Sequence, residues 1–319
     1  MKKIIFLLCL ALMACNEQKV VLPSSSGNIN QLSVVIDNQM WQGEVGETIR
    51  KHFAANVQGL PQQEPLFNLS HIPPEAFTGF LRKSRIFLKI QKDDNTGIGY
   101  MIDSLAKPQT GIIVSAPTNE GLIELLNENA SKIIHKFKQQ ELEEKRRLIQ
   151  KSLKNDEILE EKLGVQLKFP TAYRYAKTTD DFFWIRKDLE NGSMEILIYE
   201  VPLKVIDSGD TVIGNIIKMR DSIGKKHIPG PVEGSYMITE EAYAPYLFET
   251  QIDGKFAYLT KGTWEVENAF MAGPFINYAV RDEANDRYVI LEGFVFKPSA
   301  AKRDNMFELR AILESAKIN

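Results

Sequence analysis

Two carboxylates and a tryptophan lie close together in the stretch 262–275, at a spacing that permits ligand chemistry. Glu265 and Glu267 are two residues apart, and side chains at that spacing share one face of a β-strand. Paired carboxylates could supply the general acid and the base or nucleophile of a glycosidase. Trp264 beside them could stack on a sugar or a peptide in a groove. The simpler interpretation, which we favour, is a half-buried strand with Trp264 in the core and both acids in water.

Other patterns of catalytic or metal-binding residues are missing from the sequence. The four histidines, at positions 52, 71, 135 and 227, form no His-Glu-x-x-His pair, so we expect no metal site. A Gly-x-Ser-x-Gly elbow does not occur, and the glycines at 43 and 46 lack the rest of a phosphate loop. We therefore expect no cofactor, and the sequence does not identify a catalytic residue.

The first fifteen residues have the pattern of a secretory signal. Lys2 and Lys3 precede an apolar run over residues 4–12, which is far shorter than the ~20 residues needed to span a bilayer. Cys15 follows Leu12-Met13-Ala14 directly, and this arrangement resembles the lipobox of bacterial lipoproteins. The resemblance implies that residues 1–14 are a signal peptide and that Cys15 carries lipid such as palmitate. An ordinary signal with an incidental cysteine is the alternative.

Cleavage before Cys15 leaves 305 residues (319 − 14), enough for two modest domains. Basic residues then number 37 (39 − 2) against 42 acids, a formal charge of −5 that argues against nucleic acid as a partner. Cys9 is removed with the signal and lipid blocks Cys15, so the mature chain has no free thiol. This excludes disulfides, thiolate metal sites and cysteine nucleophiles.

Hydrophobic periodicity divides the remaining chain into an α+β protein with two halves. Residues 15–31, rich in serine, predict a lipidated flexible tether that spans about 20 Å. Strands and short helices follow over 32–117. A long helix region follows over 118–163, with an apolar stripe that begins at Leu122 and an N-cap at Thr118 or Asn119. Strands with hairpins occupy 164–319, including a two-residue turn at Asp253-Gly254. We therefore expect two α+β halves with mainly antiparallel sheets joined by the long helix.

Within the long helix, the dense charges at 136–147 could form an interaction patch, but a solvated helix face is the better interpretation. The two halves also share an order of glycine-led helix, short strand and Pro-preceded closing helix, which could reflect a worn duplication. The alternative is two unrelated segments that use the same turn and helix-start signals.

The stretch 262–275, together with 293–298 and Lys302-Arg303-Asp304, resembles a family of uncharacterised Bacteroidetes lipoproteins, a domain-of-unknown-function family. The resemblance covers nearly the whole mature chain and implies a cell-envelope lipoprotein without a known activity. The second half is also loosely similar to PsbP/Mog1-like domains, through residues 164–170 and the closing hairpin and helix. That similarity concerns the fold alone.

The sequence thus predicts a lipid-anchored envelope protein with a non-catalytic binding or assembly role. Its partners would be the membrane, through the anchor, and an envelope protein or glycan, but not nucleic acid. Asn16 after the cysteine favours the outer membrane, and the single acid that follows, Glu17, favours its periplasmic face over the cell surface. The alternatives are a periplasmic hydrolase that uses carboxylates such as Glu265 and Glu267 on a glycan or ester, and a structural partner of a membrane complex.

Overall fold

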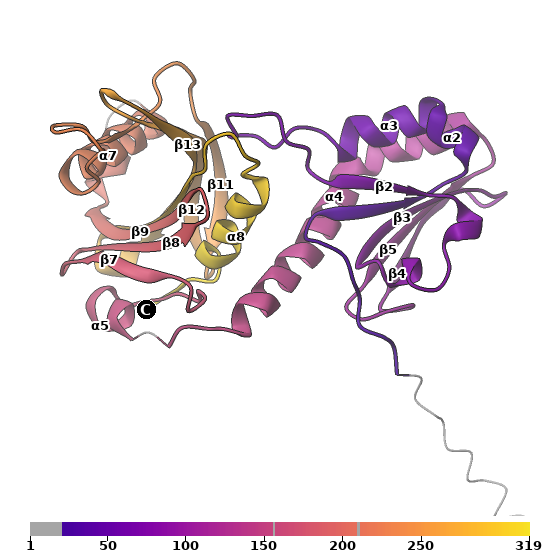
Figure 1. The fold of residues 1–319 in the computed structure, drawn as a ribbon, viewed down its shortest axis with the longest axis horizontal. Helices are drawn as coiled ribbons and strands as arrows, with labels where there is room; N and C mark the ends of the chain where they lie inside the picture. Colours follow the sequence, from indigo (N-terminus) through magenta and orange to yellow (C-terminus); the bar gives the residue numbers. More distant parts are fainter. Residues whose placement is uncertain (1–20, 156, 209–210) are drawn as a thin grey trace, which may run out of the picture.

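The computed structural model describes residues 21–155, 157–208 and 211–319, which form two domains joined by one long helix (Figure 1). Helices and sheets make up both domains, and antiparallel strand pairs prevail over the chain as a whole, so the predicted α+β class with two halves and a bridging helix is confirmed. Among these residues, no helix is both long enough and apolar enough to cross a membrane. Cys15 and the expected signal peptide lie outside the described residues.

The first domain is a five-stranded sheet in the order β2-β1-β3-β5-β4. The first four strands pair in parallel and only β4 is antiparallel, so this sheet departs from the antiparallel arrangement that prevails in the chain as a whole. Parallel strands need a crossover, and here helices or long loops provide it. Its elements are β1 (Gln31–Val35), α2 (Asn38–Gln42), α3 (Glu44–Phe53), β2 (Asn68–Ile72), η1 (Pro74–Ala76), η2 (Leu81–Lys83), β3 (Ile86–Lys92), β4 (Gly97–Ile102) and β5 (Thr110–Ala116).

Helices α3 and α4 (Asn119–Gln150) cover one face of this sheet (Figure 1). The predicted stripe of apolar residues on α4 is confirmed, because Leu122, Leu126 and Phe137 are all buried in the first-domain core. Thr118 accepts a hydrogen bond from the Gly121 N–H at 3.2 Å and so caps the helix at the expected position. The other face of the sheet is covered by the short η1 segment and its flanking loops, through Phe77.

The second domain is an antiparallel sheet in the order β10-β12-β13-β14-β9-β8-β7, with β11 paired to β12. The predicted hairpin at Asp253-Gly254 joins β11 to β12, and both residues have the positive φ that a two-residue turn requires. The elements are α5 (Ile158–Leu163), β6 (Val165–Gln166), β7 (Arg174–Thr178), β8 (Phe182–Leu189), β9 (Gly192–Pro202), α6 (Lys204–Asp207), α7 (Val212–His227), β10 (Met237–Thr239), β11 (Tyr246–Ile252), β12 (Lys255–Val266), β13 (Ala269–Asp282), η3 (Glu283–Asn285), β14 (Arg287–Phe296), α8 (Arg303–Leu313) and β15 (Lys317–Ile318).

This larger sheet is strongly curved and has a core on each face (Figure 1). Helix α8 and the end of α4 pack on one face, and α7 packs on the other. Under α7, the buried side chains of Arg220 and Glu292 form a two-bond ion pair with distances of 2.6 and 2.8 Å. A buried pair of this kind needs good hydrogen-bond geometry, because either charge alone would lose its hydration without compensation and would destabilise the fold.

Two expectations need correction. The tether over 15–31 is wrong for its later part, because Ser24 pairs with Lys107 and Ser26 with Ser84 along the first domain. The helix region over 118–163 contains two helices, α4 and the short α5, and the two ends of α4 belong to different cores. The two sheets also differ in topology, so the halves are not copies of one fold.

Helix α4 is fixed to the first domain by a buried network around Glu141. The Glu141 carboxylate is fully buried and accepts hydrogen bonds from Arg85 Nε at 2.7 Å and from the Asn30 N–H at 2.6 Å. Asn30 in turn donates from Nδ2 to Asp304 of α8 at 2.9 Å. The network therefore connects the start of the first sheet, the bridging helix and the last helix of the second domain.

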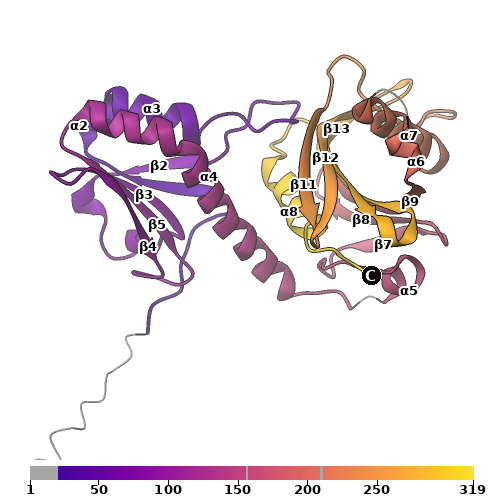
Figure 2. The same cartoon turned by 180° about the vertical axis from the view of Figure 1, so that it is seen from behind.

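A loop over residues 54–67 forms a second connection between the domains. It leaves α3, reaches α8 and returns to β2, as seen from behind in Figure 2. The nearly buried Glu64 on this loop accepts hydrogen bonds from the backbone N–H groups of Lys302 at 2.8 Å and Arg303 at 2.9 Å. Because α8 has no capping side chain of its own, Glu64 serves as its N-terminal cap from the other domain.

We predict that Glu64→Ala lowers the free energy of unfolding by about 1–2 kcal/mol, because two backbone donors at the positive end of α8 lose their acceptor. Urea denaturation measures this loss. The freed loop should also be cleaved faster by a protease within residues 54–67. Glu75→Ala, on the exposed η1 segment, is the matched control and should leave both readouts unchanged. Equal effects of the two substitutions would contradict the capping role.

Candidate functional site

The structure places Trp264 in the core of the second domain. Only 2% of its surface is exposed, and its ring packs against Phe294 with centroids 5.4 Å apart. It belongs to the cluster that α7 covers. The expectation that Trp264 stacks on a ligand in a groove is therefore wrong, and the simpler interpretation of this residue is correct.

Glu265 and Glu267 lie on the same strand face, opposite to the buried Trp264. A register shift follows Glu265, but its extra residues fall on β13, so the alternation of side chains along this strand is kept. Glu267 lies beyond the last residue of β12, where its N–H donates to the Tyr236 carbonyl at 2.9 Å. Burial raises the pKa of Glu265, and the negative charge of Glu240 adds to this effect. Because Trp264 is buried on the opposite face, the three residues do not line one groove.

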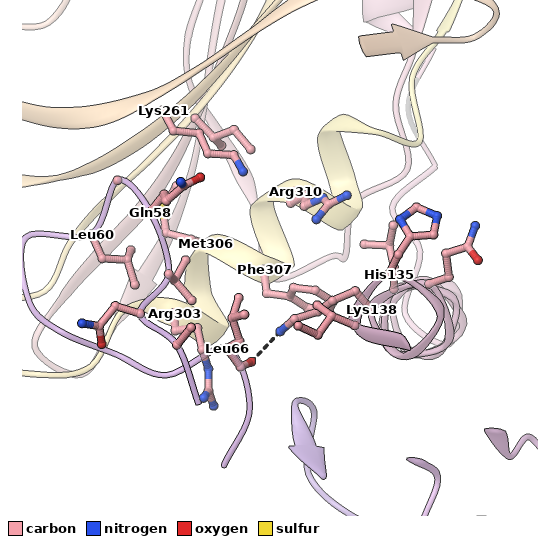
Figure 3. A pocket seen from close by; sticks show the side chains of 18 of the residues that line it. Gln58, Leu60, Leu66, His135, Lys138, Lys261, Arg303, Met306, Phe307 and Arg310 are labelled. Carbon is pink, nitrogen blue, oxygen red and sulfur yellow. Dashed lines mark hydrogen bonds between the residues drawn. The ribbon is translucent and has the colours of Figure 1, made fainter. Parts of the chain in front are cut away.

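A cavity of about 570 Å³ lies instead at the junction of the two domains (Figure 3). The 54–67 loop, helix α4, strands β12 and β13 and helix α8 all contribute to its lining. Its volume falls in the range typical of small-molecule sites, which often form between domains. The apolar part of the lining consists of Ala55, Val57, Leu60, Leu66, Ile134, Leu142, Phe275, Ile276, Met306 and Phe307.

The polar lining of this interdomain cavity is strongly cationic. Four basic side chains reach it, from three separate elements: Lys138 on α4, Lys261 on β12, and Arg303 and Arg310 on α8. His135 also contributes, but no aspartate or glutamate is among the residues that line the cavity. Such a surface attracts an anion and repels a cation.

Lys138 is placed between the two domains by its contacts. Its ammonium donates to the Leu66 carbonyl at 2.5 Å and to Asn30 Oδ1 at 2.7 Å (Figure 3). It also lies over two aromatic rings, 4.1 Å from the centre of Phe67 and 5.4 Å from that of Phe307. Burial, with the nearby charge of Arg303, lowers the pKa of Lys138 to about 7. Near neutral pH its charge is therefore sensitive to any anion that binds beside it.

Lys261 differs from Lys138 because it has no hydrogen-bond or salt-bridge partner within the described part of the chain. Its ammonium lies 5.3 Å from the ring centre of Phe248. Burial and the positive charge of Arg310 lower the pKa of Lys261 to about 8. Figure 3 shows the Lys261 and Arg310 side chains pointing toward the same space. The folded protein thus keeps a partly buried cation that has no direct ion-pair partner in the described structure.

The two arginines are already engaged by neighbouring carboxylates. Arg310 donates from Nε to Glu314 Oε1 at 2.7 Å, and this bond holds the guanidinium against the end of α8. Arg303 contacts Asp304 at 2.9 Å and donates to the Pro65 carbonyl of the first domain at 2.8 Å. These contacts orient the arginines, so that the cavity is organised without a ligand.

Catalytic chemistry has little support in this cavity. Ser131 and His135 are one helical turn apart in the lining, but both are exposed and no hydrogen bond joins them in the described structure. Neither lysine is hydrogen-bonded to a carboxylate or an imidazole that could exchange a proton with it, among the contacts of the described residues. The arrangement fits electrostatic binding of an anion better than bond-breaking.

We predict that Lys261→Met stabilises the ligand-free protein by about 1–2 kcal/mol at pH 7, because an uncompensated cation is replaced by an apolar chain of similar length. The lysine binds its proton with a pKa of about 8 when folded and near 10.5 when unfolded. Its destabilising effect is therefore complete below about pH 8 and fades as the pH rises toward 10.5. Urea denaturation at pH 7 and pH 10.5 should show the difference between the variants shrinking.

Lys218→Met is the matched control, since Lys218 is exposed on α7 and should change stability by less than about 0.5 kcal/mol. A Lys261→Met protein that is less stable than the wild type at pH 7 would instead identify the lysine as a structural part of β12.

Comparison with known proteins relates each domain to a family. One family model, described as Domain of unknown function (DUF4837), matches residues 152–315, and another, described as Domain of unknown function (DUF8532), matches residues 25–150. The two matches meet at the end of α4. No curated protein matches the chain.

Among solved structures, the crystal structure of LpqN, described as involved in cell envelope biogenesis of Mycobacterium tuberculosis, is similar over 48% of this chain and 82% of its own, with 12% identity and a TM-score of 0.29. The expectation of a family without a known function is confirmed, whereas the Bacteroidetes lipoprotein and PsbP/Mog1-like assignments stay predictions. Because the first family model matches just over half of the 319 residues, the chain belongs to the DUF4837 family.

Proposed function

We propose that this protein is a cell-envelope lipoprotein that binds an anionic ligand in its interdomain cavity without chemically changing it. The observation that carries the proposal is the cavity itself, with four basic side chains in the lining and no carboxylate among the lining residues. A binding protein needs such a preorganised charge, whereas a hydrolase would also need a nucleophile or an acid–base pair. The lysines fit this role because burial disfavours their charged forms, and an anion beside them would stabilise those forms.

Membrane attachment through lipid on Cys15 is the second part of the proposal. The segment from Ser24 to Ser26 runs along the first domain, beside Lys107 and Ser84. From Cys15 to Val21 the chain has six residue steps, which reach at most about 20 Å. Lipid on Cys15 would therefore hold the first domain close to the bilayer, with the periplasmic face of the outer membrane as the expected location. The membrane, and an envelope protein or glycan, remain the partners we propose.

The anchor is tested by the intact mass of the protein in the membrane fraction. We expect the wild type to lack residues 1–14 and to carry acyl chains, and Cys15→Ala to lose both the acyl mass and the membrane association. Cys9→Ala is the matched control, since Cys9 lies within the signal and its loss should leave the mature lipoprotein unchanged. A soluble wild-type chain without acyl mass would refute the anchor. It would not bear on anion binding in the cavity.

A further inference from the structure

The four cations of the interdomain cavity are not equally available to a ligand. Arg303 is bonded to Asp304 and to the Pro65 carbonyl, and Lys138 already donates to two acceptors. Lys261 has no hydrogen-bond or ion-pair partner in the described structure, and Arg310, although its Nε is bonded to Glu314, extends into the same space (Figure 3). An incoming anionic group would therefore be held best between Lys261 and Arg310.

The wall beyond these two cations is apolar. Leu60 and Leu66 from the 54–67 loop face the cavity together with Met306 and Phe307 of α8 (Figure 3). Ile134 of α4 also lines it. Burying an alkyl chain against such side chains strengthens binding by about fourfold for each fully buried methylene group. A volume of about 570 Å³ leaves room for such a body in addition to a small charged group.

These two surfaces exclude ligands that satisfy only one of them. A bare inorganic anion would leave the apolar wall in contact with water, and a neutral lipid would leave the partly buried Lys261 without an ion-pair partner. A cation would be repelled by all four basic side chains. The combination fits a molecule that has one charged end and one apolar part.

We propose that the interdomain cavity binds an amphiphilic anion, with its carboxylate or phosphate head between Lys261 and Arg310 and its alkyl or aryl body against Leu60, Met306 and Phe307. This inference rests on the anion-binding role proposed above and specifies the ligand class and its orientation. The ligand joins side chains from both domains, because Leu60 belongs to the first domain and the other four residues belong to the second.

The test measures binding of defined probes by isothermal titration calorimetry, with the full lipoprotein in phosphatidylcholine nanodiscs and empty nanodiscs as the blank. Octanoate and octyl phosphate combine a head with a chain and distinguish the two head groups. Octanol has the chain alone, and acetate and inorganic phosphate have the head alone. We expect one octanoate or octyl phosphate to bind per protein, at least tenfold more tightly than octanol, with no detectable binding of acetate or phosphate.

Two sets of variants assign the orientation. Lys261→Met should weaken binding of the charged amphiphile about tenfold or more, while Lys261→Arg retains it and Lys218→Met has no effect. Leu60→Ser should weaken binding of the chain without changing the preference for a charged head. Leu81→Ser, an exposed leucine on η2, is its control. Since Lys261→Met is expected to be more stable than the wild type, its loss of binding cannot come from unfolding.

The outcomes separate this inference from the proposed function. If inorganic phosphate or acetate binds as tightly as octyl phosphate or octanoate, the amphiphile is wrong but anion binding in the cavity stands. If octanol binds as tightly as octanoate and Lys261→Met has no effect, charge recognition is wrong and both proposals fall. Absence of binding by every anion would also overturn both.

Discussion

The attachment of the bridging helix α4 to the first domain depends on one carboxylate, that of Glu141. It is fully buried and accepts hydrogen bonds from Arg85, which precedes β3, and from the backbone of Asn30, which precedes β1. A buried carboxylate is stable only when its lone pairs are satisfied, so these three segments have to meet at this point. Lys138 lies one turn earlier on α4 and bonds to Asn30, and the same network therefore positions a cation in the interdomain cavity.

The cavity concentrates positive charge in a chain whose formal net charge is −3. The nearby acids are already bonded: Glu64 caps α8, Glu141 binds Arg85, and Glu314 binds both Arg310 and Arg146. Lys261 is left with a lowered pKa and without a direct ion-pair partner in the described structure. Stability alone would favour an apolar residue at such a position. A cation of this kind is best understood as a group held ready for a ligand, at some loss of folding free energy.

Features encoded by local patterns could be predicted from the sequence. The apolar stripe beginning at Leu122 specifies a long helix, and Asp253-Gly254 specifies a two-residue hairpin, because both signals act within a few residues. The parallel pairing of β1 with β2 and β3 could not be predicted in this way, since it depends on segments far apart in the chain. The solvated helix face predicted for the charges at 136–147 is wrong in part for the same reason. Glu141 and Glu144 look like residues of a solvated helix face until Arg85 is brought beside them.

The interdomain cavity could not be predicted from the sequence, because the residues that line it share no motif. Lys138, Lys261 and Arg310 lie on two helices and a strand, and Phe307 has the spacing of an ordinary core residue of α8. A core-type residue such as Phe307 lines a cavity only where a gap is left between two domain surfaces. In this protein the gap is set by the 54–67 loop, whose Glu64 is bonded to α8. Ligand specificity therefore resides in the joint between the domains, and changes in this loop would alter the site while leaving both folds intact.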